Sequence, residues 1–240
     1  MHFLLTNDDG IHAAGISALR EAALLLPGAR VTVVAPATEQ SMCGHRVTTH
    51  GPLHVEDLGG DRYAVQGTPA DCVRIALFGL GLKPDFILSG INQGGNLGQD
   101  IVISGTVAAT REAAYHGLRA AAFSHYMVKG LPVDWSRTAR WAAEVLSELI
   151  TQPLGDGEFW NVNFPHLAAD AQSLPDVVAT RPARSPLNVE FAKAEPQDTP
   201  QRTEYLYTAS YAARPQDPGS DVAACFAGKV SVGKLSVQLI

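Results

Sequence analysis

Near its start the chain reads FLLTNDDG, from Phe3 to Gly10, an apolar run that ends in an amide, two adjacent carboxylates and a glycine. An apolar run followed by turn-forming residues predicts a buried strand that ends in a polar loop. A strand that is apolar on both faces is typical of a parallel sheet covered by helices. Such sheets bind ligands at the carboxyl ends of their strands. We therefore expect Asp8 and Asp9 at a ligand-binding edge.

The two carboxylates can be interpreted in two ways. A single Asp before a glycine is well explained as a turn, because Asp binds its own backbone and Gly adopts positive φ. Two adjacent carboxylates at a strand end repel each other and lose hydration, which favours a cation between them. Asp8 and Asp9 are therefore predicted to face a metal ion.

Composition limits the classes of function. The chain has 240 residues, 46% of them hydrophobic, so it can bury one sizeable core. Its 24 acidic and 18 basic residues give a net charge of -6, which provides no basic surface for a nucleic-acid polymer. Three widely spaced cysteines suggest neither a disulfide framework nor a zinc site, and they favour a reducing, cytoplasmic setting. No apolar run approaches the length of a membrane span, so no membrane partner is expected.

The order of the predicted elements indicates the fold class. A helix over 15–26 follows the first strand, and a second β-branched strand follows over 31–35, which implies a right-handed parallel crossover. Further elements are short meander strands at 47–50, 53–56 and 63–65, helices that begin at Thr68, Ser104 and Asp134, and buried strands at 86–88, 120–123 and 159–165. We expect an α/β three-layer Rossmann-like sandwich with a mostly parallel sheet.

The chain is predicted to have two parts. Residues 1–165 carry the regular alternation and form the catalytic core. Residues 166–240 contain five prolines between Pro175 and Pro200 and two segments of alternating polarity, Glu204 to Tyr211 and Lys229 to Gln238. They predict an irregular C-terminal arm with β-hairpin strands. Because such an arm has no core of its own, we expect it to pack on the first part and at the interface of a homodimer or homotetramer.

A second polar region follows the predicted strand at 86–88. Residues 89–100 are rich in glycine and amides, so they can offer backbone N–H groups and neutral oxygen ligands to an anion and a metal. The helix after it begins at Ser104, with Gly105 and Thr106 in its first turn. Ser104 is an ordinary N-cap in one interpretation. Its position directly after the amide-rich loop favours the other, in which this helix N-terminus receives a phosphate.

Other phosphate motifs are absent from the sequence. Gly10 and Gly15 have the glycine spacing of a Walker loop, but Ile16 and Ser17 follow where that loop needs Lys and Ser or Thr. No G-x-G-x-x-G follows the first strand. Phosphatases that form an aspartyl-phosphate commonly place their acids two residues apart, whereas Gly10 occupies that position here, so a covalent aspartate is unsupported.

Taken together, these motifs resemble the SurE (survival protein E) family of metal-dependent 5′/3′-nucleotidases. The resemblance is carried by residues 6–11, Ala35-Pro36, and residues 67–73, 89–92, 104–107 and 161–163. It implies one divalent ion per subunit held by Asp8, Asp9, Ser41 and Asn92, and a phosphate received by Asn96, Ser104, Gly105 and Thr106. It also implies an arm exchanged between subunits. An oxygen-only ligand set favours Mg²⁺ or Mn²⁺ over zinc.

The sequence departs from the family pattern at Ile103, where family members usually have Tyr or His. The predicted reaction is hydrolysis of nucleoside 5′/3′-monophosphates to nucleoside and phosphate by a metal-activated water, with Asp8 and Asp9 as catalytic residues. His12 and His45 are both candidates for the acid that protonates the leaving group.

Two alternatives stay open. The first is a nucleotide-binding module without turnover, for which Ile103 is the only hint. The second is a polyphosphate hydrolase, and the absence of an extended basic surface argues against it.

Overall fold

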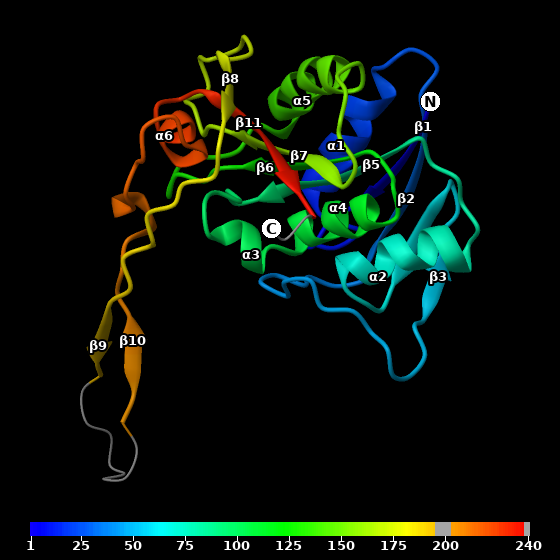
Figure 1. Ribbon diagram of the computed structural model, residues 1–240, viewed down its shortest axis with the longest axis horizontal. Coiled ribbons are helices and arrows are strands. Elements are labelled where there is room, and N and C mark those ends of the chain that lie inside the picture. The colour runs from blue at the N-terminus through cyan, green and yellow to red at the C-terminus, as the bar shows by residue number, and fades with distance from the viewer. Residues whose placement is uncertain (195–202, 238–240) are drawn as a thin grey trace.

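The computed structural model describes residues 1–194 and 203–237. Its centre is a sheet in which nine of the described strands run in the order β3-β4-β2-β1-β5-β6-β7-β11-β8 (Figure 1). The strands of this sheet are β1 (His2–Thr6), β2 (Arg30–Pro36), β3 (Val55–Asp57), β4 (Arg62–Val65), β5 (Phe86–Gln93), β6 (Ala120–His125), β7 (Glu158–Phe164), β8 (Val177–Thr180) and β11 (Val230–Ser236). The strands from β4 to β7 are parallel, β3 is antiparallel to β4, and β11 is antiparallel to β7 and parallel to β8.

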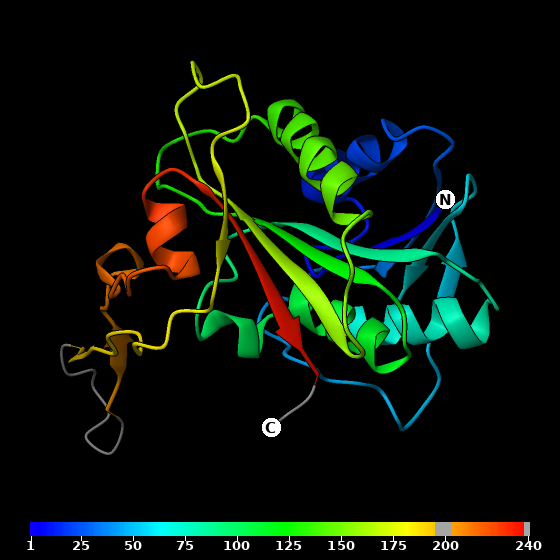
Figure 2. The same cartoon turned by 45° about the horizontal axis from the view of Figure 1, so that its top comes forward.

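Helices cover both faces of the sheet, so the predicted three-layer fold is confirmed (Figure 2). The helical elements are α1 (Ala14–Leu24), α2 (Pro69–Arg74) with its π-helical continuation η1 (Ile75–Gly79), α3 (Asp100–Ile103), α4 (Gly105–Tyr115), α5 (Trp135–Leu149), the 3₁₀ turn η2 (Tyr211–Ala213) and α6 (Asp221–Phe226). Helices α1 and α5 lie on one face, and α2 and α4 lie on the other. None of the described helices is long and apolar enough to cross a membrane.

Strand β1 shows why the sheet is buried on both sides. Phe3 and Leu5 belong to the core under α1 and α5, whereas Leu4 belongs to the core under α2 and α4. Helix α1 packs closely because Gly15 has no side chain. A Cβ there would lie 1.9 Å from the carbonyl oxygen of Ile91 in β5. This close contact fixes the loop after β1 beside the end of β5.

Three details of the predicted elements are wrong. Residues 47–50 form no strand, because the backbone N–H and hydroxyl of Thr48 both donate to the Asp71 carboxylate and bend the segment toward α2. Strand β5 continues to Gln93, so residues 89–93 are strand rather than loop. Strand β7 does not close the regular part of the chain, because β11 pairs with it along six residues from Ser231 to Ser236.

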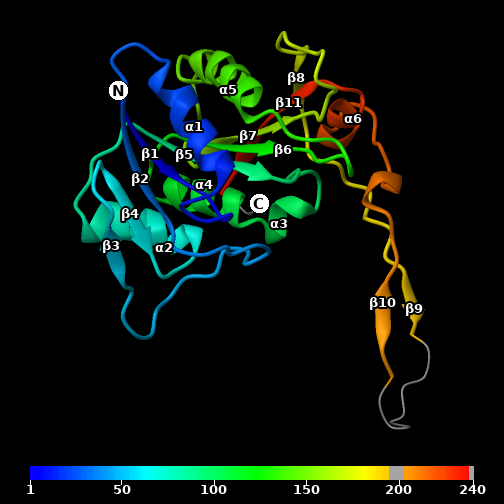
Figure 3. The same ribbon diagram turned by 180° about the vertical axis from the view of Figure 1, so that it is seen from behind.

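The part of the chain after residue 165 has two structural roles. Strands β8 and β11 extend the main sheet and helix α6 packs against them, so the sheet crosses the predicted boundary at residue 165. Strands β9 (Phe191–Lys193) and β10 (Tyr205–Tyr207) form a separate antiparallel hairpin, which confirms that a hairpin exists. Only the first of the two alternating segments lies in it, because the second contributes β11 to the main sheet. This hairpin projects away from the body of the molecule in opposite views (Figure 1, Figure 3).

Candidate active site

A pocket of about 210 Å³ lies at the carboxyl edge of the sheet, where β1 and β5 end. It contains all four predicted metal ligands and two of the four predicted phosphate-binding residues. Its lining consists of Asp8, Asp9, Ser41, Met42, Asn92, Gln93, Gly95, Asn96, Asp100, Ile103 and Ser104. None of these described lining residues is Lys, Arg or His, so the side chains of the pocket wall carry only negative charge.

Asp8 follows β1 and is 5% exposed. The hydroxyl of Thr106, in the first turn of α4, donates to Asp8 Oδ1 at 2.5 Å. Burial raises the pKa of Asp8 to about 6; the Thr106 hydrogen bond opposes this rise and the neighbouring Asp9 adds to it. The carboxylate is therefore fixed in position, and its charged form is poorly compensated by the protein alone.

Asp9 accepts a hydrogen bond at Oδ2 from the backbone N–H of Gln93, at 3.0 Å. Burial raises the pKa of Asp9, the Gln93 N–H lowers it, and the charge of Glu39 raises it further. Two adjacent carboxylates with raised pKa values gain stability from a cation that faces both of them.

Ser41 and Asn92 approach the two carboxylates from neighbouring strands. The loop after β2 is joined to the end of β1 because Gln40 N–H donates to the Asp8 carbonyl at 2.7 Å. The Ser41 hydroxyl in that loop donates to Glu39 at 2.7 Å. The amide nitrogen of Asn92, in β5, donates to the Gly94 carbonyl at 2.9 Å, which leaves Asn92 Oδ1 as an acceptor.

This donor set fits a hard divalent ion. It offers carboxylate, hydroxyl and amide oxygens, which Mg²⁺ and Mn²⁺ prefer. Across residues 1–194 and 203–237, no three His, Cys, Asp or Glu side chains gather as a metal-binding group. A metal at this pocket would therefore depend on Asp8 and Asp9 plus neutral oxygens.

The N-terminus of α4 borders the pocket through Ser104 and contacts Asp8 through Gly105 and Thr106. Ser104 caps the helix, since its oxygen accepts the Val107 N–H at 3.0 Å, and its own O–H remains available as a donor. Gly105 lies against Asp8, because a Cβ at residue 105 would come within 2.8 Å of Asp8 Cβ and 2.9 Å of Cys43 Sγ. Gly105 and Thr106 do not line the pocket. They lie behind the Asp8 carboxylate.

Asn96 is held by a network of amides. Its N–H donates to Asn163 Oδ1 at 2.8 Å, and its carbonyl accepts from Asn161 and Asn163 at 3.0 and 3.2 Å. Its side-chain nitrogen donates to Ser124 at 2.7 Å. This role of the two asparagines of β7 was not predicted from the sequence. Their i, i+2 spacing in a buried strand places them on one face, which is a signal for it.

Neither candidate acid lines the pocket. His12 is exposed. His45 contacts the buried carboxylate of Glu112 at 2.7 Å, and Glu112 also accepts from Arg74 at 2.6 Å. Ile103, the departure from the family pattern, does line the pocket and is 49% exposed.

The family model described as Survival protein SurE matches residues 3–188. The chain belongs to the SurE family. Two relatives named 5′-nucleotidase SurE, from Paramagnetospirillum magneticum and Erythrobacter litoralis, are 38% and 39% identical, cover 100% of this chain, and are themselves covered over 91% and 94% of their lengths.

The fold agrees with this assignment. A crystal structure of the SurE protein from Aquifex aeolicus superposes on this chain with a TM-score of 0.87 and 33% identity, over 100% of this chain and 95% of that one. The SurE likeness therefore extends beyond residue 188 and includes the part of the chain that carries β11.

Proposed function

We propose that this protein is a divalent-metal-dependent phosphatase that hydrolyses nucleoside 5′- and 3′-monophosphates to nucleoside and phosphate. The observation that carries the proposal is the Asp8–Asp9 pair, which lines a pocket beside the N-terminus of α4, with Asp8 buried, Asp9 half-buried and both pKa values raised. The nucleotide substrate is supported by the relatives named 5′-nucleotidase SurE.

The ion would be one Mg²⁺ or Mn²⁺ per subunit, held by Asp8, Asp9, Ser41 and Asn92. When bound, it supplies Lewis acidity toward a phosphoryl oxygen and lowers the pKa of water at the site. The chain contributes a fixed proton acceptor. Thr106 occupies Asp8 Oδ1, which leaves Oδ2 to receive a proton from an attacking water.

The phosphate would be received by neutral donors. The Ser104 O–H and the side-chain amide of Asn96 border the pocket, and the free N–H of Gly105 lies at the positive end of the α4 dipole. These donors would stabilise charge that develops on the phosphoryl oxygens during attack. They suit one terminal phosphoryl group, because the described pocket wall has no basic side chain for a polyphosphate tail.

We also propose that the hairpin joins subunits into a homodimer or homotetramer. It exposes large apolar side chains, including Phe191 at 60% and Tyr205 at 64%. A two-stranded ribbon is marginally stable in water unless it packs on other elements. Sedimentation of the full chain should give a mass of two or four subunits, and a stable monomer would contradict this proposal.

One activity screen tests the function. Hydrolysis of 5′- and 3′-monophosphates of several bases is compared with p-nitrophenyl phosphate, a sugar phosphate and polyphosphate, with Mn²⁺, with Mg²⁺ and with a chelator. We expect metal-dependent turnover with the highest kcat/KM on nucleoside monophosphates. A tenfold preference for polyphosphate or a sugar phosphate, about 1.4 kcal/mol, would contradict the nucleotide assignment. Nucleotide binding without hydrolysis would instead support the non-catalytic module.

A further inference from the structure

The pocket has a third carboxylate, Asp100, which the predicted metal and phosphate sites do not use. It begins α3, one short helix before the Ser104 cap of α4. A bare carboxylate at this position would repel a bound phosphate across the pocket. The protein must therefore either keep Asp100 away from the phosphate or compensate its charge.

The compensating charge comes from the far end of the chain. Arg214 Nη1 donates to Asp100 Oδ2 at 2.6 Å, and the Tyr211 hydroxyl donates to the same oxygen at 2.7 Å. The side chains of Arg214 and Asp100 are only 3% and 13% exposed, so solvent screens the pair weakly. Burial and the Asp100 charge both raise the pKa of Tyr211, which keeps its hydroxyl protonated as a donor.

The same arginine holds the loop that carries Asn96. Arg214 Nη2 donates to the Leu97 carbonyl at 3.0 Å, and the guanidinium carbon lies 4.6 Å from the centre of the Tyr211 ring. Arg214 lies directly after η2. We call the segments that join the hairpin to the main sheet, on both sides of β9 and β10, the root of the hairpin. The other side of the root also contacts this loop, since Leu187 N–H donates to Gln99 Oε1 at 3.0 Å.

We propose that Arg214 is a positioning residue of the active site, which neutralises Asp100 beside the phosphate and fixes the loop from Gly95 to Asp100. The proposal rests on the phosphate site of the proposed function. It adds that the root of the hairpin sets the charge of the pocket. Arg214 acts through Asp100, and its loss should weaken phosphate binding more than it slows turnover.

The test uses four variants of the full chain: Arg214→Gln, Arg214→Lys, Asp100→Asn and the double variant Arg214→Gln/Asp100→Asn. The dissociation constant of inorganic phosphate is measured by calorimetry with Mn²⁺, and KM and kcat are measured with p-nitrophenyl phosphate. For Arg214→Gln we expect about a tenfold rise in KM and in the phosphate dissociation constant, with kcat changed less than threefold.

The remaining variants separate charge from packing. Asp100→Asn should bind phosphate at least as tightly as the wild type, because it removes a negative charge and leaves Arg214 in place. The double variant should recover most of the loss, and Arg214→Lys, which keeps the positive charge but not the planar guanidinium, should lose less affinity than Arg214→Gln. If the double variant binds phosphate as weakly as Arg214→Gln or more weakly, the charge-balancing role is overturned. An Arg214→Gln variant with unchanged phosphate affinity and KM would also overturn it.

Arg137→Gln is the matched control. Arg137 is 1% exposed and donates to the carbonyls of Leu167, Ala168 and Ala171, away from the pocket. Its loss should lower Tm without changing phosphate affinity. Turnover by the wild type tests the proposed function, whereas the order of the phosphate dissociation constants tests Arg214. The two can therefore fail separately.

Discussion

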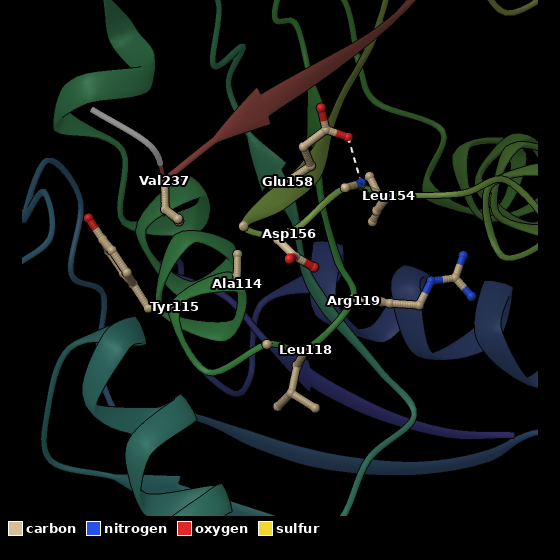
Figure 4. Close-up of a pocket in the computed structure, with 11 residues that line it drawn as sticks. Ala114, Tyr115, Leu118, Arg119, Leu154, Asp156, Glu158 and Val237 are labelled. Atoms are coloured by element: carbon tan, nitrogen blue, oxygen red, sulfur yellow. Dashed lines mark hydrogen bonds between the residues drawn. The ribbon is translucent and has the colours of Figure 1, made fainter. Parts of the chain in front are cut away.

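Two of the pockets formed by the described residues lie at opposite edges of the main sheet, and their charged groups differ in how they are compensated. The pocket at the amino ends of β6 and β7 has about 410 Å³, roughly twice the volume of the one at Asp8 (Figure 4). The residues labelled there, Ala114, Tyr115, Leu118, Arg119, Leu154, Asp156, Glu158 and Val237, include both apolar and charged side chains.

Two of the three charged side chains of the larger pocket, Glu158 and Arg119, have partners, and the third, Asp156, is exposed. Glu158 accepts the Gly155 N–H at 2.8 Å and lies 3.7 Å from the Lys234 ammonium, while Arg119 donates to the carbonyls of Leu149 and Gln152. In the smaller pocket, burial leaves Asp8 and Asp9 with raised pKa values. Poorly compensated charge, rather than volume, therefore distinguishes the candidate active site.

The largest effect should come from removing that charge. Asp8→Asn and Asp9→Asn each preserve shape but remove a negative charge from a site proposed to face a dication. We expect kcat/KM to fall by about a thousandfold, or about 4 kcal/mol, with Mn²⁺ at saturation. Circular dichroism should show an intact fold. Near wild-type turnover in either variant would refute the metal site.

Asp8→Asn should also stabilise the folded protein when no metal is bound. The pKa of Asp8 rises from 3.8 to about 6 on folding. The native state then binds more protons than the unfolded state between these values, so stability falls as pH rises from about 4 to about 6. At pH 7 the cost is about 3 kcal/mol. Asp8→Asn should therefore raise the Tm of chelated protein at pH 7 and change it little at pH 3. A lower Tm at pH 7 would contradict this reading of the buried carboxylate.

Gly105→Ala should affect the site through packing. The added Cβ would come within 2.8 Å of Asp8 Cβ, so the Asp8 carboxylate or α4 must shift. Because geometry at such a site contributes strongly to rate, we expect kcat to fall by about a hundredfold. Gly117→Ala is a control at the other end of α4, where an added Cβ meets nothing within 4 Å. Its positive φ should cost stability without changing kcat.

The neutral ligands should matter less. Ser41→Ala and Asn92→Ala remove oxygens that water can replace, so we expect the Mn²⁺ concentration for half-maximal activity to rise about tenfold while kcat is largely recovered at saturation. Metal titrations of both variants check this. A loss of kcat that excess metal does not restore would show a role other than metal binding.

The smallest effect is expected in the larger pocket. Asp156→Asn and Glu158→Gln alter its acidic groups but lie at the opposite edge of the sheet from Asp8. We expect kcat/KM to stay within about twofold of wild type, because distant, unconnected sites act independently. A tenfold loss of kcat/KM without a change in Tm would contradict the claim that only the pocket at Asp8 is catalytic.

Local sequence patterns predicted most of the sheet and the gathering of the site. Residues 3–10 alone indicated a buried parallel strand, and parallel strands necessarily bring their carboxyl-end loops together. The choice of Ser41 and Asn92 as partners of Asp8 came from the family resemblance. The cap of α4 was equally local, because a helix start depends on a few adjacent residues.

Contacts between distant segments could not be predicted in this way. Alternating polarity after Lys229 indicated a strand, but it did not say that β11 would lie antiparallel between β7 and β8. The Asp100–Arg214 pair joins residues 114 positions apart. The sequence around either residue does not indicate that the other is its partner. The Thr106 hydroxyl, which the family resemblance assigns to the phosphate, donates to Asp8 in the structure. That contact was not predicted, because helix position alone does not fix the direction of a side chain.

The place of β11 also matters during synthesis of the chain. β11 is the last strand of the main sheet to leave the ribosome, although it lies between β7 and β8. Until it emerges, the backbone of β7 has an open edge next to Phe159 and Val162, which are buried in the finished sheet. An open, apolar strand edge is a template for pairing with other chains. The nascent protein is therefore exposed to aggregation through β7 until β11 emerges, although every predicted metal ligand has already been made by then.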